Sequence, residues 1–249
     1  MRRVGRRLTG ILLEAGRHLT VGGRSADAVA PVRRSLRTLG AETITELTDF
    51  PAVLCASRNN VAAHGLPDET TLESRDLVTL DIAARVDGWC GDVAWTFSLG
   101  EGESVPATAA GTTRQGRLRK AAWDTCMAGI AACRPGTRVG DVAAAMTRTA
   151  AAAGCAIVPE FAGHGIGREL HEEPSISPRG LPGMGARLLP GMVVTVEPVV
   201  VAGAPEVAVL PDGWTYVTAD GSLAAQFEFM VYIHRDGNEI ISLPDRLPA

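Results

Sequence analysis

The stretch LVTLDIAARVDGWCGDVAWTF, residues 77–97, decides the fold. Both of its arms are rich in apolar, β-branched and aromatic residues, which favour β-strands. Asp87 and Gly88, between the arms, supply the positive φ values that a two-residue hairpin turn requires. The stretch therefore predicts an antiparallel hairpin over residues 76–98.

The predicted turn also sets the register of the two arms. A two-residue loop places Asp92 opposite residue 83, and by the same count Asp81 lies opposite residue 94. The two carboxylates then form a diagonal pair on one face, about 7–8 Å apart at Cα. Buried carboxylates cost several kcal/mol unless they are paired or bind a cation, so this pair indicates a metal site. The hairpin alone also allows an alternative to a metal site, in which both aspartates lie on an exposed face and are solvated by water.

Three further side chains follow the same pattern. Glu197 in MVVTVEPVVV and Glu228 in AAQFEFMVYI are single carboxylates inside apolar, strand-like segments. Pro198 suggests that a bulge or an edge presents Glu197. His164 lies between glycines in FAGHGIG, where backbone and imidazole can approach a ligand closely. For each residue taken singly there is an alternative without a ligand: each glutamate is equally consistent with an edge strand, and the histidine with an ordinary turn.

Taken together, four carboxylates in apolar strands and one imidazole predict a metal centre. Oxygen-rich ligation with one histidine suits Mn²⁺, Fe²⁺, Co²⁺ or Zn²⁺. Two such ions about 3.5–4 Å apart would activate a water molecule and polarise a carbonyl group. We therefore expect two divalent ions at this site.

The rest of the chain predicts both helices and strands. Helical spacing and breaks at glycine predict four helices, over 2–19, 26–39, 108–133 and 140–153. Strand-like segments follow at 51–64, Val193–Val201, Glu206–Leu210 and Ala225–His234, and the Gly- and Pro-rich stretch 163–191 predicts loops around a site. A weak repeat relates residues 19–40 to residues 134–154, which suggests two similar halves about a shared sheet.

Composition excludes several classes of protein. The net charge of −4 gives no general attraction to nucleic acid or to an anionic membrane. No stretch approaches the about 20 apolar residues of a membrane span, and Arg6, Arg7 and Glu14 interrupt any signal-peptide core. Five cysteines without a Cys-x-x-Cys pair argue against a disulfide framework. We expect a cytoplasmic protein.

Five motifs, in order and spacing, resemble the type I methionine aminopeptidases of peptidase family M24. They are FPAVLCASRNNVAAHGLPDE, the hairpin stretch, GHGIGRELHEEPSI, LLPGMVVTVEP and DGWTYVTADGSLAAQFE. The resemblance implies the α+β pita-bread fold, a pseudo-two-fold antiparallel sheet with helices packed on its outer face. It also implies a single metallopeptidase catalytic domain over 1–249 that removes N-terminal methionine from peptides or nascent chains, with a transient association with the ribosome.

The resemblance assigns roles to the site residues. Asp81 would bind one metal ion, Asp92 and Glu228 would bridge both ions, and His164 and Glu197 would complete the ligands of the second ion. Glu197 would be both a ligand and the proton shuttle. By the same resemblance, His171 would stabilise the oxyanion and His64 would contact the substrate near the scissile bond. The side-chain pocket would comprise Phe50, Cys55, Leu170 and Trp214, with Leu47 nearby.

Some positions depart from the family pattern. The family usually has Tyr at Leu47, an aromatic residue at Leu170, often His at Thr48, and His-Thr at Phe229-Met230. These changes keep open a related amide hydrolase with a changed substrate, such as a Pro-containing peptide or a biosynthetic intermediate. A non-catalytic homologue is the third alternative, which the complete ligand set argues against.

Overall fold

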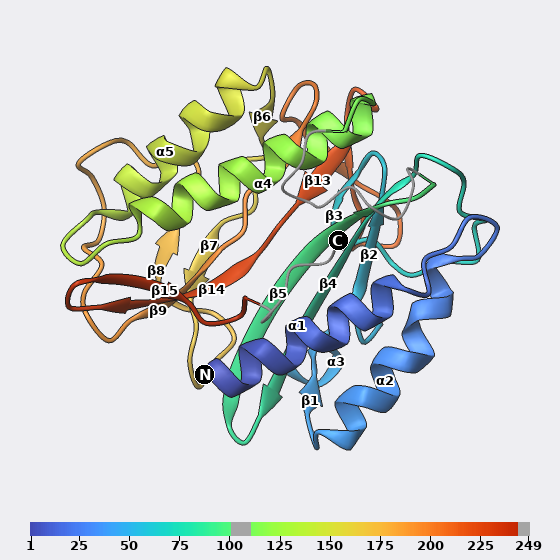
Figure 1. The fold of residues 1–249 in the computed structure, drawn as a ribbon, viewed down its shortest axis with the longest axis horizontal. Helices are drawn as coiled ribbons and strands as arrows, with labels where there is room; N and C mark the ends of the chain where they lie inside the picture. The colour runs from blue at the N-terminus through green and yellow to red at the C-terminus, as the bar shows by residue number, and fades with distance from the viewer. Residues whose placement is uncertain (101–110, 244–249) are drawn as a thin grey trace.

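The computed structural model describes residues 1–100 and 111–243, which form an α+β fold (Figure 1). The helices are α1 (Arg2–Gly16), the 3₁₀ turn η1 (Ser25–Ala28), α2 (Val29–Thr38), α3 (Ile44–Leu47), α4 (Arg114–Ala132) and α5 (Val139–Ala152). The strands are β1 (Glu42–Thr43), β2 (Cys55–Arg58), β3 (Val61–Ala63), β4 (Leu77–Val86), β5 (Trp89–Ser98), β6 (Ala156–Ile157), β7 (Gly163–Gly165), β8 (Glu172–Ile176), β9 (Val193–Val196), β10 (Val199–Val201), β11 (Val207–Val209), β12 (Tyr216–Thr218), β13 (Ala224–Gln226), β14 (Phe229–His234) and β15 (Gly237–Ile240).

The central hairpin forms as the sequence predicts. Strands β4 and β5 pair along their whole length around the turn, where Asp87 and Gly88 have φ values of 50° and 72°. Asp81 lies opposite Ala94, and Asp92 lies opposite Ala83. The predicted register is therefore confirmed, and it places the two aspartates diagonally on one face.

Two helix pairs cover the sheets (Figure 1). Helix α1 packs on β4 and β5 through Val4, Leu8 and Leu12, all buried. Gly91 of β5 allows this close approach, because a Cβ atom there would come within 2.8 Å of the Val4 and Leu8 side chains. Helix α4 packs in the same way on β10 and β13, with α5 beside it. The pairs α1/α2 and α4/α5 thus match the two halves that the weak sequence repeat suggested.

An aromatic cluster joins α4 to the strands beneath it. Trp95 of β5 contacts Trp123 of α4 at 5.6 Å and Phe227 at 5.2 Å, measured between ring centroids. Phe229 packs edge-on against both tryptophans. Phe227 and Phe229 are almost fully buried, so they anchor the segment that carries Glu228 between them.

Several predicted elements differ from the observed ones. Helix α1 ends at Gly16 rather than at residue 19, and the start of the predicted helix 108–133 lies outside the described residues. The stretch 163–191, predicted as loops, contains β7 and β8, because Gly163 and Gly165 pair with neighbouring strands despite lacking side chains. The predicted strands 193–201 and 225–234 are each interrupted, at Glu197-Pro198 and at Phe227-Glu228. Among the described residues, no helix is long and apolar enough to cross a membrane.

Candidate metal centre and substrate cavity

Every site residue that the sequence predicts lines one cavity of about 310 Å³. Its walls are formed by Ile44, Thr48, Phe50, Cys55, His64, Asp81, Asp92, Glu160, Phe161, Ala162, His164, Leu170, His171, Glu197, Trp214 and Glu228. Leu47 is not in this set, because the short helix α3 turns Ile44 rather than Leu47 towards the cavity.

Strand register brings the carboxylates together. Asp81 lies opposite Ala94, and on its other side Ala94 forms a bridge with Glu228, whose N–H donates to the Ala94 carbonyl at 3.0 Å. The two segments that carry the glutamates are paired with each other before and after their breaks, Val196 with Phe229 and Val199 with Gln226. The pairing has the same register on both sides of the breaks. Glu197 and Glu228 therefore fall opposite each other. The carboxylates form a compact row across neighbouring segments.

The imidazole of His164 completes this group. Its Nδ1 lies 2.9 Å from the Gly165 carbonyl, so Nδ1–H donates there and Nε2 remains available as a ligand. Nε2 lies 3.5 Å from Glu197 Oε1 and 3.8 Å from Asp92 Oδ2. Ligand atoms of Asp92, His164 and Glu228 all lie within 4.8 Å of one another. Burial lowers the pKa of His164 to about 4, which keeps the ring neutral and able to coordinate.

Burial and mutual repulsion perturb the carboxyl groups strongly. Burial raises the pKa of Asp81 to about 7 and that of Glu197 to about 8. The pKa values of Asp92 and Glu228 are also raised well above their ordinary values, by burial first and then by the neighbouring carboxylates. Four acids in one buried cluster, with no lysine or arginine among the described cavity walls and with neutral histidines, can ionise together only beside a cation.

Glu228 gives an independent test of the fit to a metal ion. Its Oε1 atom is buried and has no hydrogen-bond partner among the described residues. A carboxylate that has one orphaned oxygen, and an oxygen within 4.8 Å of an imidazole nitrogen and of a second carboxylate, has the chemistry of a ligand for a divalent cation. Asp81 and Glu197 lie outside that tight group of three, but Asp81 stands diagonally beside Asp92 on the hairpin, and Glu197 Oε1 lies 3.5 Å from His164 Nε2. The residues therefore fit the metal centre that the sequence predicts.

The remaining predicted residues form the substrate side of the cavity. The His171 ring stands edge-on to His164 at 4.4 Å. Across the cavity, Phe50 packs edge-on against Trp214 at 5.3 Å. Leu170 and Cys55, both buried, add to the apolar part of the wall.

His64 has a special backbone conformation, with φ of 52°. Its ring packs edge-on against Phe161 and Tyr216, at 5.4 and 5.7 Å. A left-handed conformation is uncommon for a residue other than glycine, and here it directs an imidazole into the cavity.

Sequence reasoning missed Thr195. Its hydroxyl donates to Glu197 Oε1 at 2.7 Å and accepts the His164 N–H at 2.9 Å, so it positions two of the predicted ligands. The strand period of two offered a signal, because Thr195 and Glu197 fall on the same face of one strand. Phe161 and Tyr216, which support His64, carried no comparable signal.

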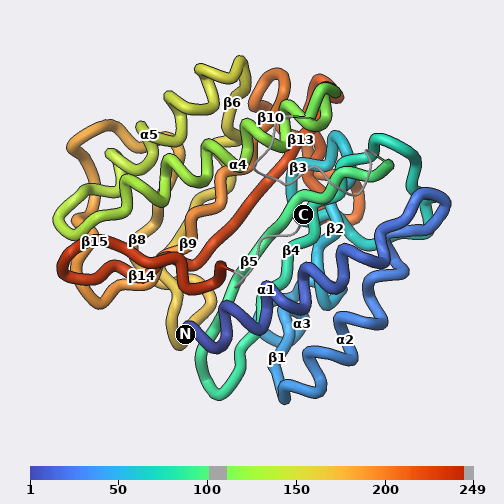
Figure 2. Tube along the Cα trace, in the orientation of Figure 1, coloured from blue at the N-terminus to red at the C-terminus, as the bar shows by residue number. Residues whose placement is uncertain are grey.

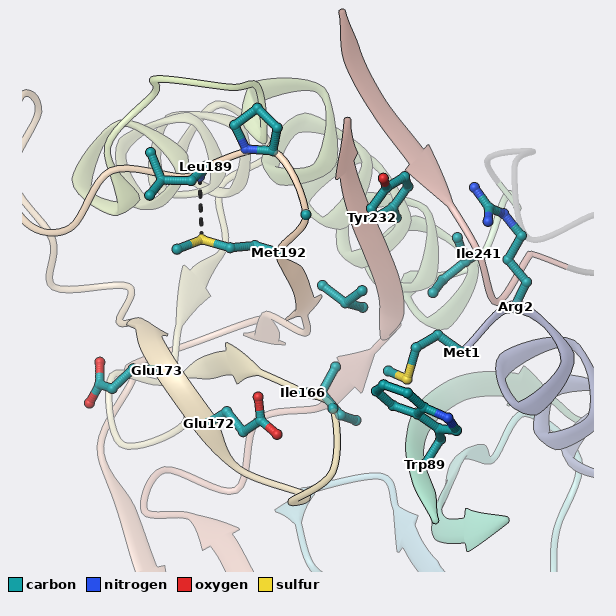
Figure 3. A pocket seen from close by; sticks show the side chains of 14 residues that line it. Met1, Arg2, Trp89, Ile166, Glu172, Glu173, Leu189, Met192, Tyr232 and Ile241 are labelled. Carbon is teal, nitrogen blue, oxygen red and sulfur yellow. Dashed lines mark hydrogen bonds between the residues drawn. The ribbon is translucent and has the colours of Figure 1, made fainter. Parts of the chain in front are cut away.

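A larger cavity of about 650 Å³ is lined by a different set of residues, among them Met1, Trp89, Ile166 and Tyr232 (Figure 3). Ile166, Trp89 and Tyr232 give it an apolar wall, and Glu172 and Glu173 are its only carboxylates. It contains neither a histidine nor a cluster of acids with raised pKa values among the described residues. The smaller cavity, with convergent titratable groups, is therefore the candidate site.

Known proteins resemble this chain over most of its length. Residues 1–235 match the pattern of metallopeptidase family M24. Methionine aminopeptidase B of Synechocystis is 41% identical over 195 residues, which are 78% of this chain and 68% of that protein. The crystal structure of methionine aminopeptidase from Rickettsia prowazekii superposes with a TM-score of 0.90 and 32% identity, covering 97% of this chain and 95% of that chain.

A more distant structure shares only the fold. Prolidase from Pyrococcus furiosus superposes with a TM-score of 0.75 at 20% identity, covering 98% of this chain and 63% of that chain. The neighbours share the pita-bread fold, so the fold that the sequence predicted is confirmed.

Proposed function

Because the chain belongs to metallopeptidase family M24, we propose that it is a metal-dependent aminopeptidase that removes N-terminal methionine from peptides and newly made proteins. One observation carries the proposal: a cluster of buried acids around His164 forms the floor of a cavity with an apolar wall. The cluster suits divalent cations, and the wall suits an unbranched, polarisable thioether side chain.

The proposed centre holds two divalent ions, Mn²⁺, Fe²⁺, Co²⁺ or Zn²⁺, on Asp81, Asp92, His164, Glu197 and Glu228. When bound, such ions supply Lewis acidity and lower the pKa of a water molecule. The same ions allow the clustered carboxylates to ionise, which removes the repulsion that raises their pKa values.

The chain's own residues perform the proton transfers. Glu197, ionised beside the bound ions, accepts a proton from the attacking water and passes it to the leaving amine. His171, beside His164, donates to the developing oxyanion. His64, held by its two aromatic neighbours, contacts the substrate near the scissile bond.

The apolar wall determines which side chain enters. Phe50, Cys55, Leu170 and Trp214 form the proposed pocket for the first residue of the substrate. The proposal further includes a single catalytic domain over 1–249, action in the cytoplasm and a transient association with the ribosome.

The test is a panel of short peptides that differ only in the first residue, assayed with Mn²⁺, Co²⁺ or Fe²⁺. We expect metal-dependent release of Met when the second residue is small. Glu197→Gln keeps a similar shape but cannot shuttle a proton, and should lower kcat by about 10²-fold or more. Absence of turnover on every Met-peptide would refute the substrate, and near-normal kcat in the variant would refute the role of Glu197.

A changed substrate is the second candidate, because Leu170 and Ile44 line the cavity with aliphatic side chains. A Pro-containing peptide added to the same panel distinguishes the two candidates. Much faster turnover of that peptide than of Met-peptides would favour a related amide hydrolase.

A further inference from the structure

The proposed metal centre lies between the two halves of the molecule. Asp81 and Asp92 belong to the hairpin of β4 and β5, whereas His164, Glu197 and Glu228 come from segments of the other half. The segment from β13 to β14, which carries Glu228, runs beside β5 (Figure 2). The distances between the ligands therefore depend on how β5 is joined to this segment.

A backbone bridge and a side chain form this joint. Ala94 of β5 bridges Glu228, whose N–H donates to the Ala94 carbonyl. Continuing the same antiparallel register by two residues places Thr96 opposite Gln226. There the Gln226 N–H donates to Thr96 Oγ1 at 2.9 Å, and the Thr96 hydroxyl donates to the Gln226 carbonyl at 2.7 Å. A side-chain oxygen thus takes the place of a pair of ladder hydrogen bonds.

A second threonine completes the hydrogen bonding of this hydroxyl. Thr79 lies opposite Thr96 in the hairpin, with the two Oγ1 atoms 2.8 Å apart. The single hydroxyl hydrogen of Thr96 goes to the Gln226 carbonyl, so Thr79 is the donor in this pair. Thr96 Oγ1 then donates one hydrogen bond and accepts two, which is its full capacity. Thr79 is 5% exposed and Thr96 is 0% exposed, so bulk water does not compete for these bonds.

This joint fixes the backbone around Glu228. Because Oε1 of Glu228 has no hydrogen-bond partner among the described residues, the placement of the carboxylate relies on the backbone that carries it. Gln226, two residues before it, pairs with β10 of its own half on one side and is held by Thr96 on the other. The edge-on contact of Trp95 with Phe227 also joins the halves, but apolar contacts are not directional. Hydrogen bonds are directional, so those of Thr96 determine the register.

We propose that Thr96, with Thr79 as its donor, is a positioning residue for the metal centre. Through Gln226 it holds Glu228 beside the aspartates of the hairpin, where ligand atoms of Glu228 and Asp92 already lie within 4.8 Å of each other. The inference rests on the proposed function, because it takes Glu228 as a ligand of divalent ions. Removal of a group that orients a metal ligand typically weakens metal binding by about 10–100-fold.

The test is calorimetric titration of the metal-free protein with Mn²⁺ alone. Thr96→Val keeps the branched shape of the side chain but removes the hydroxyl, and should weaken Mn²⁺ binding by about tenfold or more. Thr96→Ser keeps the hydroxyl and should bind Mn²⁺ within about threefold of the parent. Thr79→Val removes only the donor to Thr96, so it should weaken binding less than Thr96→Val does.

Thr218→Val is the matched control. Thr218 is also buried, and its hydroxyl also donates to a backbone carbonyl, that of Ser222, at 2.8 Å. Both valine variants should lower Tm, because each leaves a buried carbonyl without its donor. Only Thr96→Val should lose Mn²⁺ affinity, whereas a purely structural role of Thr96 would leave the affinity of both variants at the parental value.

Mn²⁺ binding by Thr96→Val within about twofold of the parent would overturn the proposal, and so would an equal loss in Thr218→Val. If Thr96→Val does not fold, Thr79→Val decides: weakened Mn²⁺ binding supports the proposal and parental binding overturns it. Assays on a short Met-peptide separate this outcome from the proposed function. A parent that binds Mn²⁺ in the expected pattern without cleaving Met-peptides would refute only the enzymatic assignment. An active parent whose Thr96→Val variant keeps full Mn²⁺ affinity would refute only the role of Thr96.

Discussion

Removal of divalent cations should make the stability of the protein fall as pH rises from 6.5 to 8. Without cations, the pKa of Glu197 is about 8 and that of Asp81 about 7, against ordinary values of 4.5 and 3.8. The folded protein then keeps protons that the unfolded chain has already lost. Stability from these carboxyls is therefore complete below their ordinary pKa values and is lost as pH rises through the raised ones.

The histidines act in the opposite sense in the lower part of this window. The pKa values of His164, His171 and His64 are lowered from 6.5, mainly by burial, so these rings favour folding more as pH rises towards 6.5. At pH 6.5 the unfolded chain still holds about half of its histidine protons, so this opposing slope persists to about pH 7.5, above which the rings are neutral in both states.

The size of the effect follows from one carboxyl. Glu197, protonated in the folded state but ionised in the unfolded chain, changes the free energy of unfolding by about 1.4 kcal/mol per pH unit. Across the window this is about 2 kcal/mol, or about 4–8 °C in Tm for a chain of this length. Asp92 and Glu228, with pKa values raised well above 3.8 and 4.5, act in the same direction.

The assay is thermal unfolding in a chelator and in excess Mn²⁺, at several pH values within the window. Chelated protein should lose Tm with rising pH, and Mn²⁺ should remove most of the loss. Glu197→Gln should decline less steeply than the parent in chelator, whereas the control Glu206→Gln, at an exposed site, should follow the parent. A chelated parent that is as stable at pH 8 as at pH 6.5 would show that the acids do not share one buried cluster.

Three further variants test single residues of the site. Asp92→Asn should bind much less metal than the exposed control Asp236→Asn, and equal metal content in the two proteins would exclude Asp92 as a ligand. His171→Ala should lower kcat by about 10²–10³-fold with little change in KM, and an unchanged kcat would exclude its contact with the oxyanion. Thr195→Val removes a hydrogen bond that lowers the pKa of Glu197, so the acid limb of the kcat profile should move to higher pH; a profile that stays in place would assign Thr195 a purely structural role.

The hairpin and its register followed from the sequence because local rules determine both. Asp87 and Gly88 fix a two-residue turn, and the turn fixes every pair along β4 and β5, including the diagonal of Asp81 and Asp92. Helix cores followed from the spacing of apolar residues for the same reason. The ends of helices were less accurate, since fraying and capping at termini depend on neighbours that the local pattern does not contain.

Tertiary contacts decided what the sequence could not. Phe229, a departure from the family pattern, is a core residue packed on Trp95 and Trp123. It therefore helps to hold the neighbouring Glu228 in place and does not line the substrate cavity. Leu47 differs from Ile44 by less than one helical turn, and only the placement of α3 shows which of them lines the cavity. Both distinctions depend on packing between distant segments.

The interruptions at Glu197 and Glu228 explain why two acids can stand in such apolar segments. A continuous ladder would confine each carboxylate between neighbouring strands, but Pro198 has no N–H to donate and breaks the ladder beside Glu197. The partner segment breaks at the matching position, since the shared register places Glu228 opposite Glu197. At each break the backbone leaves the hydrogen-bond ladder, and the two breaks lie at the same point of the cavity. The acids are thus held by strands on either side, yet directed away from the ladder towards a common ligand.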